Sequence, residues 1–119
     1  EGAIEYAREL GTTLFDVCHL GLGPDGHTAS LFPNSKQLLA TSLTFGVTDS
    51  PKPPPNRITL TFPAINRSRS IVLLVTGEGK YEALAGARGP HTSQVPASLI
   101  ARDNLTVMAD RAALPKQHV

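Results

Sequence analysis

A glycine-rich turn that also holds an acid and a histidine is the part of this sequence best suited to chemistry. Gly21, Gly23 and Gly26 are interspersed with Asp25 and His27, directly after an apolar stretch. Glycine lets the backbone approach a ligand closely, and histidine can act as a general base near neutral pH. The aspartate could orient the histidine ring or hold the turn through local amides. The spacing alone fits a plain turn with a solvated histidine as well as it fits a catalytic site.

Two further segments could hold an anion. Residues 76–80 (Thr-Gly-Glu-Gly-Lys) lie between a predicted strand and a predicted helix, where free amides and Lys80 would attract negative charge. They lack the Walker A spacing, so we expect no nucleotide P-loop. Arg57 follows a stiff proline run, and a preorganised arginine suits bidentate capture of a phosphate. The plain alternatives, a βα loop with a solvated lysine and an exposed charge at a strand end, stay open.

The composition excludes several classes of protein. The 119 residues suit one domain with its own core, and a net charge of +1 provides no long-range field for nucleic acid or a membrane surface. No apolar run approaches the roughly 20 residues that a membrane span needs, and the pattern at the start of the chain leads us to expect no signal segment. Cys18 is the single cysteine, so we expect no disulfide, a buried inert thiol and a cytoplasmic location. His19, His91 and His118 show no ligand spacing with one another or with the cysteine, so no metal site is expected.

The hydrophobic pattern predicts the elements that position these residues. Ile4, Ala7 and Leu10 share one helical face, and Gly11 marks the end of that helix. The apolar stretch 15–20 predicts a buried strand, and 28–32 predicts a short helix that Pro33 ends.

The rest of the chain continues this alternation. The expected strands are 42–47, 57–62, 70–75 and 105–109, and the expected helical segments are 63–66 and 81–88. We expect an ordered extended loop over 50–56 and a frayed end over 111–114. Strands separated by helices favour an α/β fold with a parallel sheet, in which residues 1–119 form a single domain.

Three motifs, in order, resemble those of the 6-phosphogluconolactonase family, the sugar-lactone hydrolases of the pentose phosphate pathway. They are Gly-Leu-Gly-Pro-Asp-Gly-His-Thr-Ala-Ser-Leu-Phe-Pro (21–33), Pro-Pro-Asn-Arg-Ile-Thr-Leu-Thr-Phe-Pro-Ala-Ile-Asn (54–66) and Val-Thr-Gly-Glu-Gly-Lys (75–80). The resemblance covers essentially residues 14–112 and favours the functional interpretation of each candidate segment. One small departure is Asn34, where the family usually has glycine; asparagine also tolerates a left-handed backbone.

The resemblance implies a fold, a reaction and roles for particular residues. The fold would be a partial Rossmann-like parallel sheet with flanking helices, similar to the C-terminal half of the sugar-phosphate lactonase/deaminase fold. The substrate would be 6-phosphoglucono-δ-lactone, with no metal or organic cofactor. His27 would be the general base and Asp25 would orient it. The substrate-binding residues would be Gly21, Gly23, Gly26, Arg57 and Lys80.

The family pattern also differs from this chain in its extent. Family members are roughly twice as long, and nothing here matches the glycine-rich phosphate loop and Asp-Glu-Arg motif of their N-terminal half. We therefore expect an incomplete fragment of a longer lactonase domain, with an open sheet edge that pairs with a complementing N-terminal half or in a homodimer. The isolated chain would show little or no turnover. The alternatives are a non-catalytic, assembly-dependent fragment and a sugar-phosphate deaminase or isomerase, against which the continuation 28–33 argues.

Overall fold

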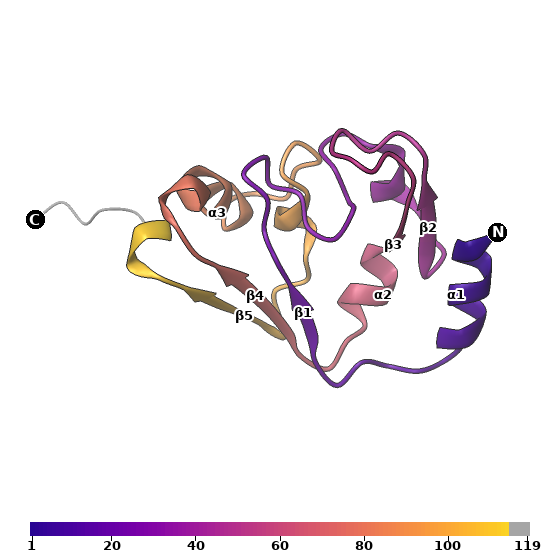
Figure 1. Cartoon of the computed structure of the whole chain (residues 1–119). Coiled ribbons are helices and arrows are strands. Elements are labelled where there is room, and N and C mark those ends of the chain that lie inside the picture. Colours follow the sequence, from indigo (N-terminus) through magenta and orange to yellow (C-terminus); the bar gives the residue numbers. More distant parts are fainter. Residues whose placement is uncertain (115–119) are drawn as a thin grey trace, which may run out of the picture.

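Three short parallel strands form the centre of the structure, a computed structural model that describes residues 1–114. They are β1 (Cys18–Leu20), β4 (Ile71–Val75) and β5 (Leu105–Ala109), in the order β1–β4–β5 (Figure 1). The expected α/β fold with a parallel sheet is confirmed. The predicted strands 70–75 and 105–109 form nearly as expected, whereas the strand predicted over 15–20 is reduced to its last three residues.

One face of this sheet carries the core. Helix α3 (Tyr81–Ala87) and the 3-10 turn Pro96–Leu99 lie on that face (Figure 1). The alternating residues Leu73 and Val75 of β4 are at most 1% exposed and pack with Leu84 and Ile100. Each such side chain stabilises the fold by about 1.5–3 kcal/mol relative to leaving it in water. The helix predicted over 81–88 is confirmed.

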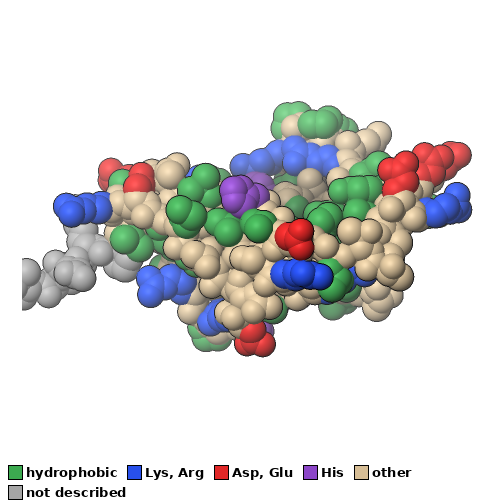
Figure 2. Space-filling view, turned by 90° about the horizontal axis from the view of Figure 1, so that it is seen from below, with side chains coloured by type: hydrophobic (Ala, Val, Ile, Leu, Met, Phe, Trp, Pro, Cys, Tyr) green, Lys and Arg blue, Asp and Glu red, His purple; other side chains and the backbone are tan. Residues whose placement is uncertain are grey.

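The other face of the sheet is uncovered by the described part of the chain. Val17, Leu74 and Met108 are 53–55% exposed there. Figure 2, seen from below, shows hydrophobic side chains gathered beside a histidine. The outer edge of β1 also has no neighbouring strand among residues 1–114. Within residues 1–114, the sheet is therefore packed on one side only.

A separate two-stranded ribbon lies beside the sheet. Strands β2 (Thr44–Val47) and β3 (Arg57–Leu60) pair antiparallel, so the parallel arrangement does not extend to the strands predicted over 42–47 and 57–62. Helix α1 (Gly2–Leu10) lies beside β2 (Figure 1). The hydroxyl of Thr44 donates to the Ala3 carbonyl. The predicted first helix and its end at Gly11 are confirmed, but Ile4 is 63% exposed rather than on the packed face.

The short helix predicted over 28–32 is wrong. Thr28 and Leu31 form an antiparallel bridge around Ala29, whose φ is +49°, so the segment is a tight turn. The Ser30 N–H donates to Oγ1 of Thr59 at 3.0 Å, and this bond to β3 replaces a helical one. A local pattern could not anticipate a bond across 29 residues. Asn34, just beyond, has φ +56°, the left-handed conformation that asparagine was expected to tolerate.

Two further boundaries differ from the prediction. The strand predicted over 57–62 stops at Leu60 because Phe62 begins helix α2 (Phe62–Asn66), which includes the helical turn expected over 63–66. Residues 111–114 are not frayed: Arg111–Ala113 form a 3-10 turn in which the Asp110 carboxylate accepts the Ala113 N–H at 3.0 Å. Within residues 1–114, no helix is long and apolar enough to cross a membrane.

Candidate active site

His27 and Asp25 form a close pair at the carboxyl end of β1. Nδ1 of His27 lies 2.5 Å from Oδ1 of Asp25, which also accepts the His27 backbone N–H at 3.1 Å. The His27 side chain is 17% exposed and that of Asp25 is 35% exposed. With Nδ1 engaged by the carboxylate, Nε2 makes no hydrogen bond within residues 1–114 and is the ring nitrogen available for proton transfer.

The pairing changes the pKa of the carboxyl group. Partial burial raises the pKa of Asp25, but the hydrogen bonds from the ring and the backbone of His27 lower it by more. The pKa of Asp25 therefore lies below its usual value. Asp25 therefore remains an anion across the pH range in which an ordinary histidine titrates.

The glycines of the turn differ in what they allow. A Cβ at Gly23 would lie 2.1 Å from Nδ1 and Cε1 of His27, so no side chain fits there. Gly26 has φ +87°, and a Cβ would lie 2.8 Å from a methyl group of Val95. At Gly21 a Cβ would meet nothing within 4 Å, and its carbonyl accepts the Thr28 hydroxyl at 2.9 Å. Two of the three predicted glycines are thus required by close approach.

Lys80 and His27 line one hollow of ≈ 470 Å³, a size that suits a small molecule. The loops after β1 and β4 form it because the carboxyl ends of parallel strands meet at the same edge of the sheet. Nζ of Lys80 donates to the Leu22 carbonyl, which ties the two loops together. The full lining is Gly21, Leu22, Gly23, Pro24, His27, Thr28, Ala29 and Lys80.

The backbone of residues 76–80, the second candidate segment, already binds a carboxylate of this chain, that of Asp110. Both carboxylate oxygens of Asp110 lie 3.1 Å from the Gly77 N–H. Residues Glu78–Lys80 form a 3-10 turn before α3 begins. The Gly77 amide is therefore engaged, and Lys80 is the part of this segment that reaches the hollow. Asp110 is a residue that the sequence did not point to.

Arg57 lies apart from the hollow. Its guanidinium donates to the carbonyls of Lys52 (3.2 Å), Pro53 (2.9 Å) and Pro54 (3.1 Å), in the loop predicted over 50–56. Its Cζ lies 5.6 Å from the centroid of the Phe32 ring, over the ring face. That ring lies 4.8 Å from the His27 ring, between centroids. Arg57 is thus connected to His27 through an aromatic ring that sequence spacing did not single out.

The remaining candidates lie outside this site. Residues 1–114 contain no group of three histidine, cysteine or acidic side chains that could hold a metal. His19 and His91 are exposed, and His118 lies outside the described residues. Burial raises the pKa of the Cys18 thiol, partly offset by a hydrogen bond with Ser68.

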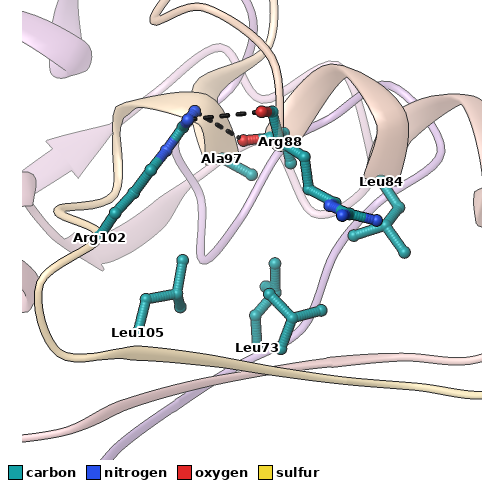
Figure 3. Close-up of a pocket in the computed structure, with 8 residues that line it drawn as sticks. Leu73, Leu84, Arg88, Ala97, Arg102 and Leu105 are labelled. Atoms are coloured by element: carbon teal, nitrogen blue, oxygen red, sulfur yellow. Dashed lines mark hydrogen bonds between the residues drawn. The ribbon is translucent and has the colours of Figure 1, made fainter.

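A second pocket lies between the sheet and α3. It has a volume of ≈ 220 Å³, and its lining, which includes Leu73, Leu84 and Leu105, contains no histidine or carboxylate (Figure 3). At its rim Arg102 donates to the carbonyls of Ala87 (3.1 Å) and Arg88 (3.4 Å), the end of α3 (Figure 3). This pocket offers no group for acid–base chemistry.

Comparison with known proteins identifies relatives. The chain is 51% identical over 105 residues to the 6-phosphogluconolactonase of Mycobacterium tuberculosis, which covers 86% of this chain and 42% of that protein. It is 42% identical over 108 residues to the rat 6-phosphogluconolactonase, covering 84% of this chain and 42% of that protein. The chain thus spans less than half the length of these curated relatives.

Solved structures agree. The 6-phosphogluconolactonase of Thermotoga maritima superposes with a TM-score of 0.78 at 32% identity, over 90% of this chain and 49% of that one. A monomeric glucosamine-6-phosphate deaminase gives 0.69 at 28% identity, over 92% and 50%. Residues 1–109 match the family described as glucosamine-6-phosphate isomerases/6-phosphogluconolactonase. The chain belongs to this glucosamine-6-phosphate isomerase/6-phosphogluconolactonase family.

Proposed function

We propose that this chain carries the proton-transfer site of a 6-phosphogluconolactonase, which hydrolyses 6-phosphoglucono-δ-lactone to 6-phosphogluconate. The observation that supports it most is the His27–Asp25 pair in a hollow shared with Lys80. We infer the substrate from the relatives named 6-phosphogluconolactonase. A base beside a cation suits a phosphorylated lactone, because the phosphate needs a charge partner and the attacking water needs a proton acceptor.

The reaction follows from the free ring nitrogen. His27 Nε2 takes a proton from water as its oxygen bonds to C1 of the lactone, which gives a tetrahedral oxyanion. When the carbonyl re-forms, the bond between C1 and the ring oxygen breaks, and the imidazolium returns its proton to that oxygen. Asp25 stabilises the imidazolium between the two steps. A positioned base of this kind contributes about 10²–10⁴-fold.

Substrate binding involves the loops on both sides of the hollow. Lys80 supplies the positive charge for the phosphate. The N–H groups of Gly23 and Gly26 are engaged within the turn, at 2.8 Å with the His27 carbonyl and 2.9 Å with the Gly23 carbonyl. These glycines therefore shape the hollow rather than donate to substrate. Gly21 contributes open backbone at its wall.

We further propose that full activity needs a complementing half of the domain, in a longer form of this protein, or a second copy of the chain. The uncovered sheet face and the unpaired outer edge of β1 support this, since exposed apolar surface and free strand edges favour pairing. We place the protein in the cytoplasm because its one cysteine is a buried free thiol.

Lactone hydrolysis above the spontaneous rate tests the function. We expect turnover when the chain is supplied with a complementing N-terminal half of the family, little or none by the chain alone, and none with glucosamine 6-phosphate. His27→Asn should abolish most of the turnover, whereas the exposed His91→Asn serves as the matched control. An active His27→Asn variant would show that His27 is not the base, and inactivity of every assembled form would overturn the function itself.

A further inference from the structure

The guanidinium of Arg57 is held by the protein on several sides. Besides the three carbonyls of Lys52, Pro53 and Pro54, it donates from Nη1 to Oγ of Ser30 at 3.4 Å. A planar fork can satisfy several acceptors at once, and a lysine ammonium cannot reproduce that geometry. These bonds use four of the five N–H donors of the guanidinium, so bidentate capture of a phosphate would require Arg57 to give up at least one of them.

Strand β3 holds the segment that follows His27 at several points. Arg57 and Thr59 both bond to Ser30, through its hydroxyl and its N–H respectively. The Arg57 guanidinium also lies over the Phe32 ring, an arrangement that attracts a cation to the face of the ring. Phe32 is 2% exposed, so its ring has little freedom to move. The proline loop, Arg57 and Phe32 form one connected support.

That support ends on the histidine ring. The rings of Phe32 and His27 are 4.8 Å apart between centroids and inclined at 39°. Asp25 holds the same imidazole at Nδ1. The Asp25 contact fixes the Nδ1 edge of the imidazole, and the Phe32 contact limits rotation of the ring. Together they set the direction of Nε2.

We propose that Arg57, acting through Phe32, is a positioning residue for His27 rather than a ligand of the substrate phosphate. The proposal rests on the proposed function for its catalytic consequence, but the effect on the His27 ring is independent of any reaction. Arg57 orients the base because the proline loop fixes its guanidinium and the guanidinium fixes the aromatic ring.

The first test reads the ring itself by NMR. Arg57→Lys and Phe32→Leu should move the ¹H and ¹⁵N imidazole signals of His27, because the ring current of Phe32 acts on the imidazole 4.8 Å away, and should leave those of His91 in place. Arg102→Lys is the matched control: Arg102 also holds three backbone carbonyls, of Ala87, Arg88 and Gly89, but it precedes β5, at the opposite end of the parallel sheet. Phe32→Leu keeps most of the buried volume and shows how far the His27 signals move when the aromatic ring itself is lost. Arg57→Gln decides the matter if Arg57→Lys fails to fold, and unchanged His27 signals in the folded Arg57 variant would overturn the proposal.

The second test separates positioning from phosphate binding in the form of the protein that hydrolyses the lactone. A positioning role predicts that Arg57→Lys lowers kcat by about 10- to 100-fold with KM nearly unchanged, since small misplacements of a catalytic group cost that much. A phosphate ligand predicts the reverse, a raised KM with kcat retained, and that result would overturn the proposal. If wild-type protein shows no turnover, the proposed function fails while the NMR result still decides the role of Arg57.

Discussion

The His27 ring is packed so closely by its neighbours that few residue types fit at the positions around it. Gly23 accepts no side chain because a Cβ would overlap the ring, and the Gly23 N–H is bonded to the His27 carbonyl at 2.8 Å. The Asp25 carboxylate and the Phe32 ring occupy two further sides. What remains open is the side toward the hollow that Lys80 also lines. The residue types of the turn therefore follow from the space around one imidazole.

The lowered pKa of Asp25 makes its contribution to stability depend on pH. A carboxyl group whose pKa falls on folding stabilises the fold above its unfolded pKa of about 3.9 and loses that contribution as the pH falls through the lower folded value. Asp25→Asn should therefore be less stable than wild type near neutral pH, and the difference should shrink below about pH 4. Denaturant unfolding at several pH values measures it. Asp16→Asn, at an exposed carboxylate, is the control, and a gap that does not change with pH would contradict the assignment.

At the scale of elements, Asp110 joins two loops at the carboxyl edge of the sheet. Its carboxylate accepts the N–H of Gly77, after β4, and that of Ala113, after β5. Asp110→Ala leaves both donors without this partner, so we expect a loss of about 1–2 kcal/mol in the free energy of unfolding. Asp103→Ala is the matched control, since its exposed carboxylate makes no hydrogen bond within residues 1–114. Equal stability of the two variants would show that the junction contributes nothing.

The individual elements show which parts of the fold sequence patterns can predict. The strand at 70–75 and the helix at 81–88 were predictable because each one's hydrophobic pattern matches the burial that the structure shows. The turn at 28–31 was not, because bonds from distant β3 residues decide its conformation.

The candidate site divides in the same way. The His27–Asp25 pair lies within two residues of sequence, so its spacing was visible. The contacts of Phe32 with His27 and Arg57, and of Asp110 with Gly77, depend on how separate elements pack. Nothing in the local order of residues specifies them.

At the scale of the molecule, the uncovered sheet face should make the isolated chain bind apolar probes. Leu74 of β4 and Met108 of β5 are neighbours in register, and both are more than half exposed. Neither has a covering element among residues 1–114, so their surface stays in contact with water unless a complementing half or a second copy covers it.

Replacing both with lysine tests that face directly. The Leu74→Lys/Met108→Lys double variant should fold, because both side chains already point to solvent, but should lose most of its fluorescence with a hydrophobic dye and any self-association seen by sedimentation. Leu39→Lys is the matched control: Leu39 is 84% exposed but lies in the turn Lys36–Leu39, away from the sheet. A complementing half that covers the face should suppress dye binding by the wild-type chain and fail to bind the double variant. Equal dye binding by the double variant and wild type would show that the apolar surface lies elsewhere on the molecule.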